Sequence, residues 1–345
     1  MVVSRRRPKK GIAMKILVTV GAGEVFDSFF TPKVREILEG LGEVEYNATG
    51  HQAYTKEELI RHVKDVDILI TGWGTPRVDE DVMKEANRLK IHAHTGGTMA
   101  TMTCKEEYDR GVIVLSGNDL FAKSVAEGTL VYTLMALRKM YEDVNSMKSG
   151  GWRRIPGRNS GLIGKKIGIV GYGAISKYYI ELLKWFEPEI LVASKHITVE
   201  EARQKGIKIA SLEEIFETCD IISLHNALND ENRGLITGKL FHKIKPGALF
   251  VNTARAGVVV EEDMMCELRT GRFTAVLDVF HKEPLPVESE LRVMSNVILF
   301  PHMAGPTFDI REQVTLKLIR DIQAILSGDP YEDEIPYEYA IRMTR

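Results

Sequence analysis

The sequence contains few cysteines, and they lie far apart. Three of them, Cys104, Cys219 and Cys266, occur among 345 residues, and none forms a CxxC pair. This scarcity excludes a disulfide-stabilised scaffold and a zinc site built from clustered cysteines. Free thiols are typical of a reducing compartment, so we expect a cytoplasmic protein.

Neither sign of charge predominates, and long apolar runs are lacking. Lys and Arg number 46 and Asp and Glu 48, which gives a net charge of −2. A dedicated nucleic-acid binder would carry a strongly basic domain, so we expect no nucleic-acid partner. No apolar run approaches the roughly 18 residues that span a bilayer, so we also expect no membrane association.

The N-terminus is locally basic. Arginines and lysines crowd the stretch from Arg5 to Lys10, and the apolar run that follows, Ile16–Val20, is too short for a secretory signal. We predict an extension over residues 1–13 ahead of a core that begins near Met14. Contact of its basic side chains with an acidic partner is the alternative interpretation.

The chain is rich in short apolar strands that alternate with helices. This pattern predicts βαβ units around a parallel sheet. The first series has expected strands at Lys15–Val20, Val66–Thr71, Lys90–His94 and Val112–Leu115, and expected helices at Pro32–Glu39, Asp79–Asn87 and Lys105–Arg110.

A second series follows a glycine-rich loop that begins at Gly150. Six strands with helices between them have the content of a complete dinucleotide-binding sheet. The expected strands are Lys166–Val170, Ile190–Ala193, Ile221–Leu224, Ala248–Asn252, Ala275–Val279 and Val297–Phe300.

Two longer helical patterns define the predicted domains. Ser124–Met140 opens with a Ser-x-x-Glu capping box, and Arg311–Leu326 ends at Gly328 after the last strand, from where it can pack back onto the first domain. We predict an α/β fold of two Rossmann-like domains, each a parallel sheet flanked by helices. The substrate domain comprises residues 14–117 plus 308–345 and is discontinuous, and residues 118–307 form the dinucleotide-binding domain.

A glycine loop follows the first strand of the second series. Gly171 permits a tight turn and Gly173 lets the backbone approach a pyrophosphate. The loop, which includes Ala174 and Ile175, leads into a helix expected at Lys177–Trp185, whose N-terminal N–H groups favour phosphate. Ser176 stands where the motif commonly has a third glycine. We predict that this loop binds a dinucleotide, and a merely structural glycine turn is the alternative.

The end of the following strand bears on cofactor choice. NAD-binding sheets carry an acidic residue there, but this strand ends in Ser194, Lys195 and His196. A hydroxyl and two basic groups can hold a 2′-phosphate. The sequence therefore predicts NAD(P) as cofactor and favours NADP, with NAD as the alternative.

Three polar residues follow the last three strands of the second series: Arg255, Glu283 and His302. Ligands of open parallel sheets bind beyond the carboxyl ends of the strands, so we expect these side chains to share one crevice. A histidine can protonate a developing alkoxide, a neighbouring carboxylate favours the protonated form, and an arginine can bind a substrate carboxylate. This set suits hydride transfer between a nicotinamide and a 2-hydroxy acid.

With these segments the chain resembles the D-isomer-specific 2-hydroxyacid dehydrogenases. The resemblance is strongest at Ser124–Glu127, the glycine loop, Asn252–Gly257, and Asp278 to Pro284 together with Pro301-His302. It implies that Arg255 binds substrate, that Glu283 is the histidine partner and that His302 is the acid/base. Formate dehydrogenases of the family carry Gln where Glu283 stands, so formate is not expected as substrate, and small 2-keto acids such as glyoxylate or hydroxypyruvate remain open.

The resemblance also implies further binding residues and an assembly. Asn252, Thr253, Ala254 and Asp278 would line the nicotinamide, Gly96 and Gly97 would offer N–H groups to the substrate carboxylate, and the Ser124–Met140 helix would form the core of a homodimer. The family includes corepressors with the same fold, so a dinucleotide-sensing corepressor or scaffold is the alternative function.

Two features admit simpler explanations. Trp73 can wall the substrate cleft or simply pack within its loop. His92 and His94 share one face of a strand and could ligate a metal, but packed or pocket-lining roles are favoured and we expect no metal.

Overall fold

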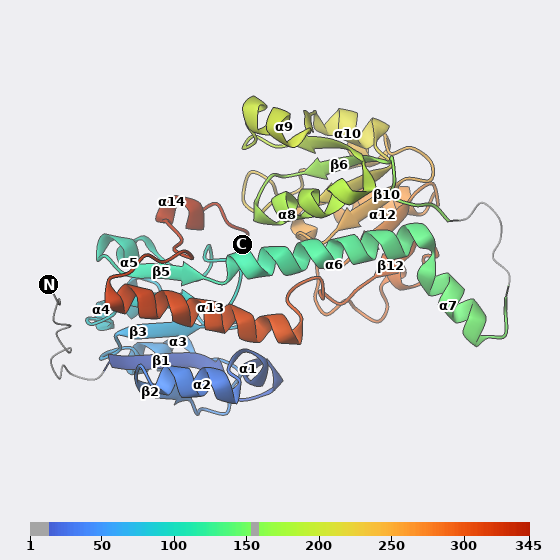
Figure 1. The fold of residues 1–345 in the computed structure, drawn as a ribbon. Helices are drawn as coiled ribbons and strands as arrows, with labels where there is room; N and C mark the ends of the chain where they lie inside the picture. Colours follow the sequence, from blue (N-terminus) through green and yellow to red (C-terminus); the bar gives the residue numbers. More distant parts are fainter. Residues whose placement is uncertain (1–13, 153–158) are drawn as a thin grey trace, which may run out of the picture. The chain divides into compact units, whose positions relative to one another are not determined.

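The computed structural model describes residues 14–152 and 159–345, so the expected N-terminal extension lies outside the described residues. Two compact units are present (Figure 1). The first contains the described residues up to Asn118 together with Phe308–Ile341, and the second contains Asp119–Thr307 with Arg342–Arg345.

The first unit is built on a five-stranded parallel sheet in the order β2-β1-β3-β4-β5. The strand order reverses between β1 and β3, which is where ligands of doubly wound sheets bind. Its strands are β1 (Met14–Gly21), β2 (Gly42–Asn47), β3 (Ile68–Thr71), β4 (Ile91–His94) and β5 (Ile113–Ser116). Its helices are α1 (Glu24–Phe29), α2 (Pro32–Glu39), α3 (Lys56–His62), α4 (Glu80–Glu85), α5 (Lys105–Asp109), α13 (Phe308–Ser327) and α14 (Tyr337–Ala340).

The second unit is built on a seven-stranded parallel sheet in the order β12-β11-β10-β9-β6-β7-β8. Its strands are β6 (Lys166–Val170), β7 (Glu189–Ala193), β8 (Lys208–Ile209), β9 (Ile221–Leu224), β10 (Leu249–Asn252), β11 (Thr274–Leu277) and β12 (Val297–Leu299). Its α-helices are α6 (Asn118–Arg138), α7 (Met140–Lys148), α8 (Ala174–Leu183), α9 (Val199–Lys205), α10 (Leu212–Thr218), α11 (Gly238–Phe241) and α12 (Glu261–Leu268). The order again reverses beside the first strand, between β6 and β9. The fold therefore consists of two Rossmann-like parallel sheets flanked by helices, which confirms the predicted fold class.

Both faces of the second sheet are buried. Along β10, Leu249 and Val251 join one hydrophobic cluster and Phe250 joins another. Successive strand side chains point to opposite faces, so the sheet separates two apolar layers, each covered by helices. This burial explains why the strands of the second series are continuous apolar runs in the sequence and why their predicted bounds lie close to the observed ones.

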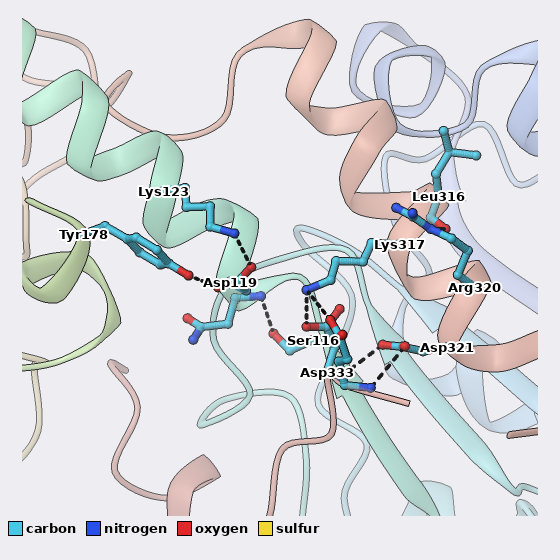
Figure 2. Close-up of polar contacts among 11 residues, drawn as sticks. Ser116, Asp119, Lys123, Tyr178, Leu316, Lys317, Arg320, Asp321 and Asp333 are labelled. Atoms are coloured by element: carbon cyan, nitrogen blue, oxygen red, sulfur yellow. Dashed lines mark hydrogen bonds and ion pairs between the residues drawn. The ribbon is translucent and has the colours of Figure 1, made fainter. Parts of the chain in front are cut away.

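The long helix α6 starts earlier than predicted. It begins at Asn118, so Ser124 lies inside the helix and is not its N-cap; the Ser124 hydroxyl instead donates to the carbonyl of Gly305 at 3.2 Å. Asp119, in the first turn, accepts hydrogen bonds from Tyr178 of α8 and from Lys123 (Figure 2). The predicted capping box was therefore wrong, because the helical pattern continues upstream of it.

Helix α6 also qualifies the argument from apolar runs. Its 21 residues are long and apolar enough to cross a membrane by length and composition, a test that buried helices of other proteins also pass. Here Ala126, Tyr132 and Ala136 pack in the same cluster as Ile167 and Ile169 of β6. The apolar face of α6 is thus used for packing within its own unit.

Several short elements went unpredicted: β2, α1, α3, α7, β8 and α14. Strand β2 is only partly buried, and the two residues of β8 are exposed, so neither shows the apolar pattern of a core strand. Helix α3 carries a capping box in which Thr55 accepts the N–H of Glu58 at 3.2 Å and Glu58 accepts the N–H of Thr55 at 2.8 Å. That Thr-x-x-Glu signal is present in the sequence and predicts the helix start.

The segment after α13 is bound back onto that helix. Asp321 accepts the backbone N–H groups of Glu332 at 3.2 Å and of Asp333 at 3.0 Å, and Lys317 pairs with Asp333 at 2.9 Å (Figure 2). The predicted substrate domain included residues up to 345, but the last four residues, Arg342–Arg345, belong to the second unit. Arg345 donates its N–H to Leu228 at 2.9 Å, which joins the C-terminus to the second unit.

Candidate active site

The glycine loop of the second unit has the shape that a dinucleotide requires. Gly171 adopts φ +97°, and a Cβ there would lie 2.6 Å from the backbone nitrogen of Asn226, so this position requires glycine. A Cβ on Gly173 would meet no heavy atom within 4 Å, so its free side is open space. Within the part of the chain that the structure describes, the N–H groups of Ala174 and Ile175 donate to no protein acceptor. These residues fit a pyrophosphate at the N-terminus of α8.

Ser176, which replaces the third glycine, strengthens the loop. Its fully buried hydroxyl accepts the N–H of Gly173 at 2.8 Å and donates to the Gly173 carbonyl at 3.0 Å. The serine closes the first turn of α8 from within. The departure from the usual motif is therefore compatible with a phosphate-binding turn.

Asn226 was missed by sequence analysis. It follows β9, the neighbour of β6 at the point where the strand order reverses, and its backbone abuts Gly171. Its Oδ1 is buried and has no hydrogen-bond partner among the described residues. A buried acceptor without a partner is costly, so this atom points to a ligand donor such as a cofactor amide or hydroxyl. Its position two residues after a strand at the switch point was a usable signal.

The contrast between the two glycines gives a testable prediction. We expect Gly173→Val to leave the free energy of urea unfolding within about 1 kcal/mol of wild type, because the new side chain meets open space. We expect it to weaken NAD(P)H binding, measured by nicotinamide fluorescence, about 100-fold through loss of phosphate contacts. Gly161→Val is the matched control, since Gly161 also faces open space and lies outside the loop. Unchanged cofactor affinity in Gly173→Val would contradict the assignment.

The residues predicted to choose the cofactor lie at the end of β7 and are accessible. The Ser194 hydroxyl accepts the N–H of His196 at 3.1 Å, so it stabilises the turn after the strand. Lys195 and His196 are exposed, and Lys195 lies 3.5 Å from Glu231, also exposed. Such a surface ion pair is weak and leaves the lysine available to another anion.

The segment after β10 is held in a fixed turn. Asn252 accepts the N–H of Ala254 at 3.1 Å and donates to the carbonyl of Arg255 at 3.2 Å, while Thr253 shares a 2.8 Å hydroxyl contact with Thr129 of α6. Asn252, Thr253 and Ala254 are all buried. The turn therefore presents Arg255 from a rigid support.

Arg255 is half-buried, and its Nη1 donates to the Ala254 carbonyl at 2.8 Å. Burial lowers the pKa of Arg255, and the negative charge of Glu283 opposes that shift. Guanidinium remains charged at any physiological pH, so the site keeps a partly desolvated cation. Such a cation binds anions more strongly than one in bulk water.

Glu283 and His302 are paired. His302 Nδ1 lies 2.8 Å from Glu283 Oε2, and the other carboxylate oxygen, Oε1, accepts the N–H of Phe280 at 2.9 Å. Burial raises the pKa of Glu283, but the hydrogen bonds from His302 and Phe280 and the charges of His302 and Arg255 outweigh it, so the pKa is lowered overall. Glu283 is thus an ionised acceptor that fixes Nδ1 as the protonated nitrogen and directs Nε2 outward.

His302 itself sits in an unusual backbone conformation. Its φ of +57° is in the left-handed region, which a non-glycine residue occupies at some cost. Asp278 supports it: its buried carboxylate accepts the N–H groups of Met303 at 2.8 Å and of Ala304 at 3.0 Å. Burial raises the pKa of Asp278 although both N–H groups favour the charged form. Asp278, predicted to line the nicotinamide, therefore also holds the loop that carries His302.

The predicted substrate loop lies in the first unit. Gly96 and Gly97 follow β4, and the Ser116 hydroxyl contacts their carbonyl oxygens at 3.0 and 3.2 Å. Their own N–H groups donate to no acceptor within residues 14–152 and 159–345. Carbonyls held on one side and N–H groups left open suit a loop that receives an anion.

Trp73 follows β3, the strand beside β4, and Thr71 at its end is the register partner of His94. Trp73 is 37% exposed, and its ring packs edge-on against Phe29 with ring centroids 5.4 Å apart. The guanidinium carbon of Arg311 lies 5.2 Å from the centroid of the Trp73 ring. Packing within the loop and partial exposure are both observed. Trp73 is thus partly packed at the same sheet edge as Gly96.

His92 and His94 contact a hydroxyl and a carboxylate of neighbouring elements. No group of three or more His, Cys, Asp or Glu side chains able to hold a metal was found among the described residues. Both rings instead contact the Thr71 hydroxyl at 2.9 Å, and His92 also meets Glu107 at 2.8 Å. Glu107 was not anticipated, because it lies fifteen positions away on α5.

The second unit has the sheet of a dinucleotide-binding domain, with Arg255, Glu283 and His302 beyond the ends of its strands. These features are typical of the oxidoreductase class of enzymes. Residues 130–304 match the family model described as the D-isomer specific 2-hydroxyacid dehydrogenase, NAD binding domain. The chain belongs to the D-isomer-specific 2-hydroxyacid dehydrogenase family, as the sequence resemblance predicted.

Relatives with assigned activities cover most of the chain. It is 32% identical over 302 residues to a D-3-phosphoglycerate dehydrogenase of Methanocaldococcus jannaschii, covering 87% of this chain and 56% of that protein. It is 31% identical over 282 residues to a glyoxylate reductase of Pyrococcus furiosus, covering 79% of this chain and 83% of that protein. The chain thus spans about half the length of the phosphoglycerate dehydrogenases it matches.

Solved structures share the fold. The TT0316 protein of Thermus thermophilus superposes with a TM-score of 0.74 at 27% identity, covering 94% of this chain and 100% of that one. An acyclic imino acid reductase superposes with a TM-score of 0.79 at 23% identity, with the same coverage of both chains.

Proposed function

We propose that the protein is an NAD(P)-dependent D-2-hydroxyacid dehydrogenase that acts on a small 2-keto acid and its D-2-hydroxy acid. The 2.8 Å contact between His302 Nδ1 and Glu283 Oε2 carries this proposal. It commits Nδ1 to the carboxylate and leaves Nε2 to exchange a proton with substrate. Half-buried Arg255 adds the cation that an anionic substrate requires.

Each of the three side chains has a separate task in the reduction. Arg255 binds the substrate through its carboxylate or keto oxygen, and the turn stabilised by Asn252 keeps the guanidinium in place. His302 Nε2–H donates a proton to the oxygen as negative charge develops on it. Glu283 stabilises the imidazolium through Nδ1–H. When bound, a nicotinamide would supply the hydride for reduction and would accept it in the reverse direction, where His302 takes the hydroxyl proton.

The residues after β7 favour NADP over NAD. Ser194, Lys195 and His196 offer a hydroxyl and two basic groups where an NAD-preferring sheet carries an acid. We expect NADPH to bind at least about tenfold more tightly than NADH, since a 2′-phosphate adds a charge-assisted hydrogen bond. Nicotinamide fluorescence with both cofactors checks this. Equal or tighter binding of NADH would reject the preference.

The substrate belongs among small 2-keto acids. Relatives carry the names hydroxypyruvate reductase and glyoxylate reductase, which supports glyoxylate and hydroxypyruvate as first candidates. The decisive experiment is a panel of 2-keto acids with NADH and NADPH, followed by loss of absorbance at 340 nm. Cofactor binding without turnover on any acid would favour the dinucleotide-sensing corepressor or scaffold.

We also propose that the protein is a cytoplasmic homodimer built around α6. Val131 of α6 and Met140, Val144 and Met147 of α7 are large apolar side chains that remain about half exposed, which supports a partner surface there. Light scattering of the purified chain measures the oligomeric state.

A further inference from the structure

A chain of hydrogen bonds runs through the core of the first unit. Glu107 Oε1 lies 2.8 Å from His92 Nδ1, and His92 Nε2 lies 2.9 Å from the Thr71 hydroxyl. The same hydroxyl lies 2.9 Å from Nδ1 of His94. Glu107, His92 and Thr71 are fully buried, and His94 keeps 3% of its surface exposed. The reaction proposed above uses none of these four side chains.

Glu107, at one end of this series of hydrogen bonds, accepts further hydrogen bonds. Its Oε2 accepts the Thr103 hydroxyl and also the N–H of Cys104 at 3.3 Å. A buried net charge is costly, which favours the arrangements in which the Glu107–His92 pair is neutral as a unit. Two arrangements satisfy this condition: a carboxylate with an imidazolium, or a protonated carboxyl that donates to Nδ1 of a neutral imidazole.

Both neutral arrangements give His92 Nε2 the same role toward Thr71, that of a hydrogen-bond donor. In each of them Nε2 carries a hydrogen and donates to the Thr71 oxygen. The single hydroxyl hydrogen of Thr71 is then directed to Nδ1 of His94, because its other contact, the Ala93 carbonyl, is longer at 3.5 Å. His94 Nδ1 is therefore an acceptor. The polarity would reverse only if the pair carried a net negative charge.

The other end of the chain lies under the predicted substrate loop. Burial lowers the pKa of His94 to about 3, with a further contribution from His92, so the ring is neutral and has one hydrogen. With Nδ1 as the acceptor, that hydrogen is on Nε2. A Cβ on Gly96 would lie 2.2 Å from this Nε2, so the ring tip fills the space where a side chain would be. The ring tip of His94 therefore lies directly beside Gly96, whose backbone N–H has no protein acceptor among the described residues.

We propose that His94 is a carboxylate-binding residue of the Gly96–Gly97 loop, with Nε2–H as the donor, and that Thr71, His92 and Glu107 are positioning residues that fix this tautomer. The ligand class is the carboxylate of a 2-oxo acid. This inference rests on the proposed function for the identity of its ligand. The hydrogen position itself can be measured without any turnover.

The tautomer of His94 is the first test. Long-range ¹H–¹⁵N spectra of the protein with ¹⁵N-labelled histidine show which ring nitrogen carries the hydrogen, with His94→Gln identifying the signal. We expect Nε2–H in the wild type, and a mixture of both tautomers in Thr71→Val, which removes only the linking hydroxyl. An Nδ1–H tautomer in the wild type would overturn the proposal.

Ligand binding is the second test. We expect Thr71→Val to raise the KM for the 2-keto acid and the Kd of oxamate, a non-reducible analogue with one carboxylate, about tenfold. The kcat and the affinity for NAD(P)H should change less than about threefold, since neither depends on the carboxylate donor. An unchanged KM and oxamate Kd would overturn the proposal.

Thr133→Val is the matched control. Thr133 is also fully buried and bonds another side chain, the Tyr179 hydroxyl at 3.1 Å, but it belongs to the second unit and not to the loop. An equal loss of oxamate affinity in both variants would show a general effect of deleting a buried hydroxyl and would overturn the proposal. If the wild type reduces no 2-keto acid, the proposed function fails, whereas the tautomer and oxamate binding still decide the role of His94.

Discussion

His302→Ala should lower kcat for 2-keto acid reduction by about a hundredfold or more, the usual consequence of removing a general acid. The substrate oxygen would then develop its charge without a proton donor. Cofactor affinity should stay near the wild-type value, because the glycine loop proposed to hold the phosphates is a separate part of the second unit. Steady-state absorbance at 340 nm and nicotinamide fluorescence measure the two effects. Turnover at the wild-type rate would remove His302 from the mechanism.

His242→Ala is the control for this experiment. His242 Nδ1 lies 3.2 Å from Glu267 Oε1, so it repeats the His–Glu pairing on an exposed surface of the same unit. We expect no change in kcat and only a small change in stability, since exposed pairs contribute little. Equal losses in both variants would attribute the effect to a general disturbance of the unit.

The pairing of Glu283 with His302 could be predicted because it depends on topology. In a parallel sheet, the carboxyl ends of neighbouring strands lie at one edge, and β11 and β12 pair through Leu277 and Leu299. Residues a few positions beyond those ends therefore have to share that edge. The apolar runs that mark such strands are strong signals because both faces of the second sheet are buried.

The support beneath the pair could not be predicted in the same way. The φ of +57° at His302 and its support by Asp278 are tertiary features, set by two backbone N–H groups that meet a buried carboxylate. Glu107 is a similar case, since only the packing of α5 on the sheet brings it to His92. A local pattern contains no information on which distant side chain will fill a given space.

Local motifs also differed in reliability for a physical reason. The Ser-x-x-Glu pattern at Ser124 does not form a capping box, whereas the similar Thr-x-x-Glu pattern at Thr55 does. A capping box stabilises a helix start only where the chain upstream leaves the helix. Before Thr55 the chain is a loop, whereas Asn118 extends α6 upstream of Ser124.

Arg255→Lys should lower kcat/KM for the 2-keto acid by about a hundredfold. Lysine keeps the positive charge, but it lacks the planar fork that binds two oxygens at once and is more strongly hydrated. Loss of a buried, charged hydrogen-bonding partner costs about 2–5 kcal/mol, which corresponds to roughly thirtyfold to several thousandfold in binding or rate. The expected loss lies at the lower end because a cation remains.

Arg269→Lys provides the comparison. Arg269 also forms a forked contact, with Glu290 at 2.9 and 2.6 Å, but both side chains are exposed and lie outside the site. We expect its kcat/KM to equal that of the wild type and its urea midpoint to change little. A kcat/KM near the wild-type value in Arg255→Lys would show that charge alone suffices at this position. The planar fork would then contribute little to substrate affinity, and the positive charge held by the turn after β10 would be the main contribution of this residue.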